Sequence, residues 1–260
     1  MEPLVAEIIS VGNELLSGRV VNTNASWIAD KITRLGGVVR RIVAVGDNVE
    51  ECSTVIKEVL GRRPKLIIMT GGLGPTFDDR TLESLSIALN VPLEVNLEAL
   101  RMIEEKYGGE VNPPRFKMAR LPRGSNPLYN FVGTAPGCLV KANDTIIVAL
   151  PGVPSEMKAM FEAHVEPLIS RLTSTAYVHR LIRVRGIEES SLAPMIDDVM
   201  KRYKAVYVKS HPKRNGELHI DVELSCRAQS IDDAKKNVDE ACSLLIDLIL
   251  KAGATAEELI

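Results

Sequence analysis

A glycine-rich segment that ends in two aspartates is the part of the sequence that most directly indicates chemistry. It reads Thr70-Gly-Gly-Leu-Gly-Pro-Thr-Phe-Asp-Asp79. Gly71, Gly72 and Gly74 leave backbone N–H groups unshielded ahead of an expected helix, and a helix N-terminus attracts anions such as phosphate. The segment lacks the Gly-Lys-Ser/Thr ending of a Walker A loop. It therefore predicts a phosphate-binding loop without a lysine, and the alternative is a simple strand-to-helix turn.

Acidic side chains near that loop predict a divalent cation. A carboxylate beside bound phosphate repels it unless an ion such as Mg²⁺ lies between them. Asp79 ends the loop, and Asp47 follows a neighbouring strand, so the two could flank one pocket. Asp78 and Glu14 are candidates to orient an attacking water. Each acid also has a structural alternative: Asp78 and Asp79 could stabilise a helix start, Asp47 could form an Asx turn, and Glu14 could lie in a solvated loop.

Alternating strands and helices must position these residues. Apolar segments typical of buried strands alternate with amphipathic segments typical of helices. We expect strands over 4–11, 38–45, 66–70 and 145–150, and helices over 24–35, 49–60, 78–89, 97–107, 115–120 and 155–168. This order predicts an α/β fold with a doubly wound, mostly parallel sheet, in which ligands bind outside the carboxyl ends of the strands. Residues 122–136, rich in Pro, Gly and Asn, are expected to be an irregular insertion.

The pattern changes near residues 171–175, where we place a domain boundary. We expect a strand over 177–185, a helix over 189–203, a hairpin of 205–210 and 217–225 around Asn215-Gly216, and a helix over 231–251. The order of these elements predicts an α/β domain over 1–170, followed in the sequence by a small α+β domain over 171–260. Basic residues gather at the start of the small domain, which indicates either a solvated face or a wall for nucleotide phosphates.

Composition narrows the class of protein. The chain has 260 residues, of which 45% are hydrophobic and 25% charged, which is typical of a globular protein with a packed core. Its net charge of −2 argues against nucleic acid or a membrane surface as the main partner, so a small molecule is expected. Four cysteines without CxxC spacing predict neither a zinc site nor a disulfide framework and fit a cytoplasmic protein. The N-terminus lacks the features of a signal peptide, and no apolar run approaches the roughly 18 residues that span a bilayer.

Several motifs, taken together, resemble one known family. They are Ser10–Gly18 with Val21–Asn24, Val45–Asn48, Thr70–Asp79, Val132–Gly137 and Leu150–Met157. In this order they resemble the N-terminal region of CinA-type proteins, the competence/damage-inducible family, which is itself similar to the molybdopterin-binding fold of MogA, MoaB and MoeA. Asn13 stands where the family commonly has threonine. Longer CinA proteins append a nicotinamide-nucleotide amidase domain, which we do not expect in this chain.

The resemblance implies binding of a nucleotide-like or pterin-like phosphate compound and, for CinA-like members, a metal-dependent ADP-ribose pyrophosphatase. It implies that Asp47 and Asp79 are the acids of the pocket and that they hold a divalent ion such as Mg²⁺. The candidate ligand-binding residues on the matching motifs are Asn24, Thr70, Gly71, Gly72, Gly74, Thr76, Gly133, Thr134, Pro136, Gly137, Pro151 and Gly152.

The leading hypothesis is a cytoplasmic pyrophosphohydrolase that cleaves ADP-ribose, or a related nucleoside diphosphate compound, to AMP and a sugar phosphate. The glycine loop would bind the diphosphate, and a metal-bound water would attack phosphorus. Two alternatives use the same site: molybdopterin chemistry by adenylylation or metal insertion, and nucleotide binding without turnover. A homo-oligomer is also expected, because the related folds associate.

Overall fold

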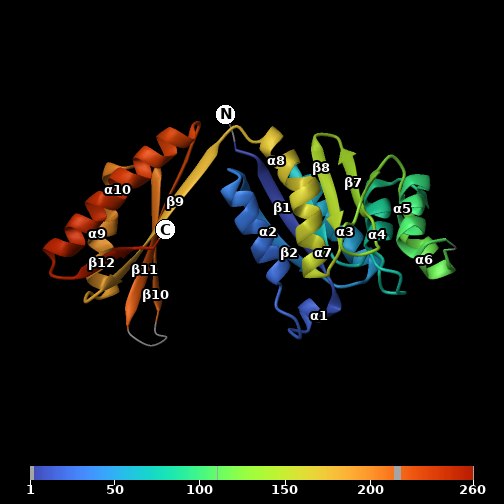
Figure 1. The fold of residues 1–260 in the computed structure, drawn as a ribbon, viewed down its shortest axis with the longest axis horizontal. Helices are drawn as coiled ribbons and strands as arrows, with labels where there is room; N and C mark the ends of the chain where they lie inside the picture. Colours follow the sequence, from blue (N-terminus) through green and yellow to red (C-terminus); the bar gives the residue numbers. More distant parts are fainter. Residues whose placement is uncertain (1–2, 110, 214–217, 260) are drawn as a thin grey trace. The chain divides into compact units, whose positions relative to one another are not determined.

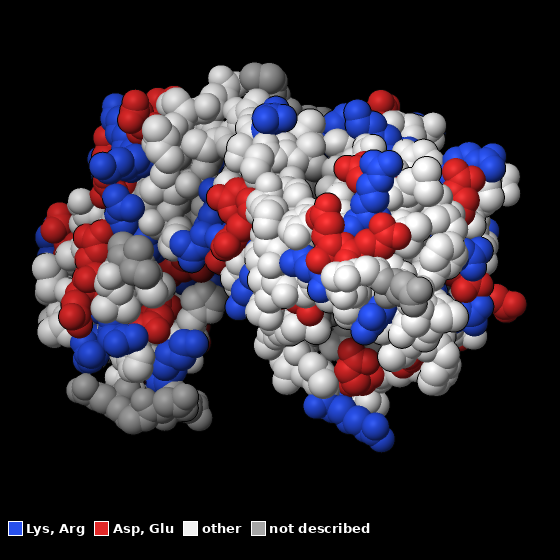
Figure 2. Space-filling model, turned by 45° about the vertical axis from the view of Figure 1, so that its right-hand side comes forward, with Lys and Arg blue, Asp and Glu red and all other residues white. Residues whose placement is uncertain are grey.

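The computed structural model describes residues 3–109, 111–213 and 218–259. The chain forms two compact units, of which one ends at Thr173 and the other begins at Ser174 (Figure 1). Figure 2 shows acidic and basic side chains interspersed over one face of the molecule.

The first unit is built on a six-stranded sheet with the strand order β2-β1-β3-β8-β7-β6. The strands are β1 (Val5–Val11), β2 (Val38–Val45), β3 (Leu66–Thr70), β6 (Asn126–Leu128), β7 (Gly137–Ala142) and β8 (Thr145–Leu150). The first four strands in spatial order are parallel, whereas β7 and β6 are antiparallel to their neighbours. The predicted α/β fold with a mostly parallel sheet is therefore confirmed.

Helices cover both faces of this sheet (Figure 1). The apolar side chains of α2 (Thr23–Arg34), α7 (Pro154–Met160) and α8 (Glu166–Leu172) pack with one face of β1, β3 and β8. Those of α3 (Val49–Gly61), α4 (Thr81–Leu89) and α5 (Leu97–Tyr107) pack with the other face. Because successive strand residues point to opposite faces, Ile8 joins the first cluster and Ile9 the second.

Three sequence expectations need correction in this unit. The helix expected from residue 78 begins at Thr81. The helix expected over 155–168 is divided by a π-helical turn, η1 (Phe161–Val165). The insertion expected to be irregular contains β6 and part of β5 (Arg120–Pro122), which pairs with β4 (Leu93–Val95). Two short helices, α1 (Asn13–Leu16) and α6 (Pro113–Met118), complete the unit.

The second unit is a four-stranded antiparallel sheet with two helices. Its elements are β9 (Ala176–Arg185), α9 (Glu189–Arg202), β10 (Val206–Lys213), β11 (His219–Ala228), α10 (Ile231–Lys251) and β12 (Thr255–Glu258). The strand order is β10-β11-β9-β12. The predicted α+β architecture is confirmed, with β12 as an unpredicted fourth strand. The expected Asn215-Gly216 turn lies outside the described residues.

Every helix within residues 3–109, 111–213 and 218–259 is too short or too polar to cross a membrane.

Candidate functional site

Three loops meet at the carboxyl edge of the parallel sheet. The amide of Gly71, directly after β3, donates to the carbonyl of Leu150 at the end of β8 (3.1 Å). Gly71 has a φ of +97°, and a Cβ on it would lie 2.2 Å from the carbonyl oxygen of Val11 at the end of β1. A Cβ on Gly152 would lie 3.3 Å from the Cα of Gly71. The three loops therefore pack backbone against backbone.

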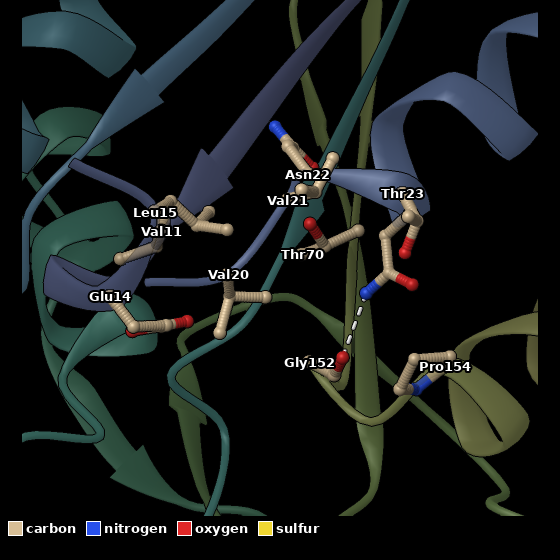
Figure 3. A pocket seen from close by; sticks show the side chains of 11 residues that line it. Val11, Glu14, Leu15, Val20, Val21, Asn22, Thr23, Thr70, Gly152 and Pro154 are labelled. Carbon is tan, nitrogen blue, oxygen red and sulfur yellow. Dashed lines mark hydrogen bonds between the residues drawn. The ribbon is translucent and has the colours of Figure 1, made fainter. Parts of the chain in front are cut away.

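A cavity of about 110 Å³, the smaller cavity, lies between the loop after β1, the start of α2 and the loop after β8 (Figure 3). It is lined by Val11, Glu14, Leu15, Val20, Val21, Asn22, Thr23, Asn24, Thr70, Gly152 and Pro154. The side chain of Asn22 caps α2 by accepting a hydrogen bond from the amide of Ala25 (3.2 Å). This cap fixes the first turn of α2, which carries Asn24 into the cavity wall.

Asn24 has one satisfied and one unsatisfied polar atom. Its Nδ2 donates to the carbonyl oxygen of Gly152 at 2.7 Å, the dashed line that ends at Gly152 in Figure 3. This bond fixes the orientation of the amide, because only the NH₂ group can donate to a carbonyl. The Oδ1 of Asn24 is buried and accepts no hydrogen bond in the part of the chain that the structure describes. A ligand that donates a hydrogen bond would satisfy it.

A second cavity of about 340 Å³, the larger cavity, adjoins the glycine loop. It is lined by Gly72, Leu73, Gly74, Pro75, Asp79, Met118, Thr134, Ala135, Pro151, Gly152, Val153 and Glu156. Gly152 borders both cavities. The structure thus brings Gly72 and Gly74 of the glycine loop together with Thr134 and the Pro151-Gly152 turn. The predicted ligand-binding residues that line neither cavity are Gly71, Thr76, Gly133, Pro136 and Gly137.

The turn that ends the glycine loop has its own hydrogen bonds. Asp79 Oδ2 accepts from the amide of Thr76 (2.9 Å) and from its hydroxyl (2.6 Å). The Thr76 hydroxyl also contacts Asp78 Oδ1, and this hydrogen bond lowers the pKa of Asp78. These hydrogen bonds form a turn ahead of α4, which explains why the helix begins at Thr81 and not at residue 78. Thr81, the first residue of α4, donates from its hydroxyl to the carbonyl of Gly71 (2.8 Å), so the helix N-terminus still adjoins the loop.

The other two candidate acids lie on the α1 side of the edge. Asp47 Oδ2 accepts a hydrogen bond from the amide of Asn13 (3.0 Å), and Asn13 Oδ1 accepts one from the amide of Asp47 (3.3 Å). Glu14 lines the smaller cavity, whereas Asp47 lines neither cavity. This separation follows from the sheet order, in which β1 lies between β2 and β3. Asp79 and Asp47 are therefore on loops that are not adjacent.

Glu156, in the first turn of α7, is the second carboxylate of the larger cavity beside Asp79, and it is not among the site residues expected from the sequence. It accepts a hydrogen bond from Asn130 Nδ2 (2.7 Å), and a Cβ on Gly133 would overlap its carboxylate. No group of three or more His, Cys, Asp and Glu within residues 3–109, 111–213 and 218–259 is placed to hold a metal ion. Mg²⁺ is, however, commonly held by one or two carboxylates together with substrate phosphates. Asp79 and Glu156, which both line the larger cavity, are the carboxylates that could act in this way.

Comparisons with known proteins agree with this architecture. The model of a family described as "Probable molybdopterin binding domain" matches residues 7–171. A protein of Pyrobaculum aerophilum is 48% identical, with 97% of each chain covered, and one of Sulfolobus acidocaldarius is 40% identical over 100% of each. The crystal structure of CinA from Thermoplasma acidophilum, a protein described as having unknown function, is 42% identical with a TM-score of 0.61, and the match covers 64% of this chain and 98% of that one. The chain therefore belongs to this molybdopterin-binding-domain family, and its α/β unit is similar to CinA.

Proposed function

We propose that the α/β unit is a metal-dependent pyrophosphohydrolase that acts on ADP-ribose or a related nucleoside diphosphate compound. The observation that carries the proposal is the arrangement at the carboxyl edge, where two cavities share Gly152 and where Gly72 and Gly74 of the glycine loop border the larger one. A dinucleotide-like compound needs such a divided site, with room for a sugar or base on either side of its phosphates. The motifs that resemble CinA-type proteins imply the same compound class.

In this proposal each group at the edge has a separate task. Amides of the glycine loop, with the N-terminus of α4 behind them, bind the diphosphate. Asn24 Oδ1 accepts a hydrogen bond from a ribose hydroxyl or a ring N–H. Asp79 and Glu156 would hold the divalent ion, which neutralises phosphate charge and lowers the pKa of a bound water. Asp47 positions the Gly12–Glu14 loop through Asn13, and Glu14 is the group proposed to orient the water.

Replacement of Asp79 by asparagine is expected to lower the rate of AMP release from ADP-ribose about 10- to 100-fold in the presence of Mg²⁺. The substitution removes the charge that holds the ion, while the asparagine oxygen can still accept from the amide of Thr76. Asp144→Asn, in the β7–β8 turn, is the matched control and should retain the parent rate. Chelation by EDTA should abolish AMP release. Full activity of the Asp79→Asn protein would remove the metal role of this residue.

Replacement of Asn24 by alanine is expected to weaken ADP-ribose binding about 2- to 10-fold, because one hydrogen bond to the ligand is lost. Calorimetry with Mg²⁺ and a non-hydrolysable analogue of ADP-ribose measures affinity without turnover and keeps the ion that the proposed site requires. Asn96→Ala is the control, because Asn96 caps α5 and lines neither cavity, and its loss is expected to cost about 1 kcal/mol of stability without a change in affinity. Unchanged affinity of the Asn24→Ala protein, at parent stability, would show that the unpaired oxygen does not face the ligand.

Nucleotide binding without turnover is the second candidate function. The observation that favours it is that Thr76 already hydrogen-bonds both Asp78 and Asp79, as in a turn with a purely structural role. Tight binding of ADP-ribose in calorimetry, with no AMP formed after long incubation with Mg²⁺, would favour this function. The family match makes a pterin phosphate the other compound to include in the same titration.

A further inference from the structure

The small unit presents one face of its sheet without a covering helix of its own. Both of its helices, α9 and α10, pack on the same face, as Figure 1 shows. Strand residues that point toward the helices, such as Ile182, Val184, Val222 and Leu224, form the core of the unit. Because strand side chains alternate between faces, the odd-numbered residues of β9, β10 and β11 lie on the opposite face. We call this the open face.

Aromatic side chains gather at one end of the open face. In the strand register, Tyr177 pairs with Arg227, and the next row on this face is His179, Ser225 and Tyr207. The rings of Tyr177 and His179 are stacked, with centroids 5.9 Å apart and an angle of 27° between planes. The guanidinium of Arg227 lies 5.3 Å from the centroid of the Tyr177 ring. Tyr207, on the edge strand β10, is 59% exposed.

Basic side chains outnumber acidic ones on the same face. The basic residues are Arg183, Arg185, Lys209, Lys213 and Arg227, and the acidic ones are Asp221, Glu223 and Glu257. Two arginines are paired with acids across the strands, Arg183 with Asp221 (2.9 Å) and Arg185 with Glu257 (3.4 Å). His211 faces Glu223 (3.9 Å) and His219 faces Asp221 (3.7 Å). The exposed lysines of β10 add positive charge beside the aromatic rows.

We propose that the open face binds single-stranded nucleic acid. Bases stack on Tyr177, His179 and Tyr207, and the phosphates lie along Lys209 and Lys213. Four-stranded sheets that bind RNA stack bases on aromatic side chains of neighbouring strands in this way, and base stacking tolerates different sequences because every base has a π-face. The face is too rich in charged pairs to resemble the apolar core of a dimer interface. The net charge of −2 predicted no nucleic-acid partner, but it averages over both units, whereas binding depends on local charge.

Fluorescence anisotropy with the full-length chain tests the proposal. The probes are labelled oligouridylate and oligothymidylate of about 12 nucleotides each. Comparison of the two affinities shows whether the face binds RNA or DNA more tightly. The Tyr207→Ala protein should bind roughly 10- to 100-fold more weakly than the parent, and Tyr207→Phe, which keeps the ring, should bind like the parent. Binding should also weaken steeply between about 50 and 200 mM salt, because phosphate contacts release counterions.

A matched pair of charge reversals distinguishes binding at the open face from non-specific attraction of nucleic acid to positive charge elsewhere on the protein. Lys209→Glu, on the open face, should lose binding, whereas Lys201→Glu, on α9 with a side chain that is 77% exposed, should retain it. Three results would overturn the proposal: no binding of either polymer by the parent at low salt, equal losses in the two lysine variants, or parent affinity in Tyr207→Ala. Sedimentation can supply a fourth overturning result: conversion of a dimer to a monomer by Tyr207→Ala would mean that a second copy covers the face.

Discussion

Replacement of Arg62 by alanine is expected to lower the free energy of unfolding by about 3–5 kcal/mol, because it leaves a buried carboxylate without its partner. Glu7 lies on β1 and is 0% exposed. Arg62, which follows α3, donates from Nε to both carboxylate oxygens at 3.1 Å and from a terminal nitrogen to Oε2 at 2.6 Å. This bidentate contact is the counter-charge of Glu7, and it raises the pKa of Arg62. Without Arg62, the carboxylate of Glu7 must either stay buried as an unpaired charge or be protonated.

Chemical unfolding of the full-length chain, followed by tryptophan fluorescence, measures this effect. Trp27 is the one tryptophan of the sequence and packs edge-on against Phe161 at 5.3 Å, so it reports on the α/β unit. Arg123→Ala is the control, because Arg123 pairs with Glu94 at the surface and its loss should cost under about 1 kcal/mol. Replacement of both Glu7 and Arg62 by leucine should recover part of the stability, since no lone charge remains. Equal unfolding midpoints for the two arginine variants would contradict the prediction.

Hydrophobic periodicity predicted the central strands because burial dictates their composition. Residues 66–70 and 145–150 are buried throughout, and the sequence shows them as continuous apolar runs. Among the strands that it missed, β6 contains Pro127 and β12 is the polar segment Thr-Ala-Glu-Glu at a sheet edge, whereas β7 is mostly buried but directly follows the residues expected to be irregular. The strand conformation of β6 comes from its pairing with β7, and that of β12 from its pairing with β9. Local propensity therefore carries little information about them.

The candidate site was predictable in its location and less so in its contacts. Parallel strands place their carboxyl ends at one edge, so the loops after β1, β3 and β8 could be grouped from sequence alone. The sequence does not reveal the strand order, and β1 separates the loops that carry Asp47 and Asp79. The bond between Asn24 and Gly152 joins residues that are 128 positions apart. Glu156 was missed as a cavity residue because a carboxylate in the first turn of a helix already has a structural role, and its contact with Asn130 joins residues that are 26 positions apart.

Replacement of Gly71 by alanine is expected to cost about 2–5 kcal/mol of stability and to abolish ADP-ribose binding. Two effects add at this residue. A φ of +97° is strained for a residue with a side chain, and the new methyl group would lie 2.2 Å from the Val11 carbonyl oxygen, a main-chain atom that cannot move without shifting β1. The loop after β3 would then separate from the loop after β8, whose Gly152 lies against it. Unfolding of the full-length chain and calorimetry with ADP-ribose measure the two consequences.

Gly18→Ala separates the strain from the clash. Gly18 also has a positive φ, +71°, but nothing lies within 4 Å of a Cβ built on it. This variant should therefore lose only the cost of the left-handed conformation, about 1–2 kcal/mol, and should keep the parent affinity. The difference between the two variants measures how closely β1 and the glycine loop pack. If Gly71→Ala bound ADP-ribose as tightly as Gly18→Ala, the backbone packing of the three loops would have no part in ligand binding, and the site would have to lie elsewhere in the chain.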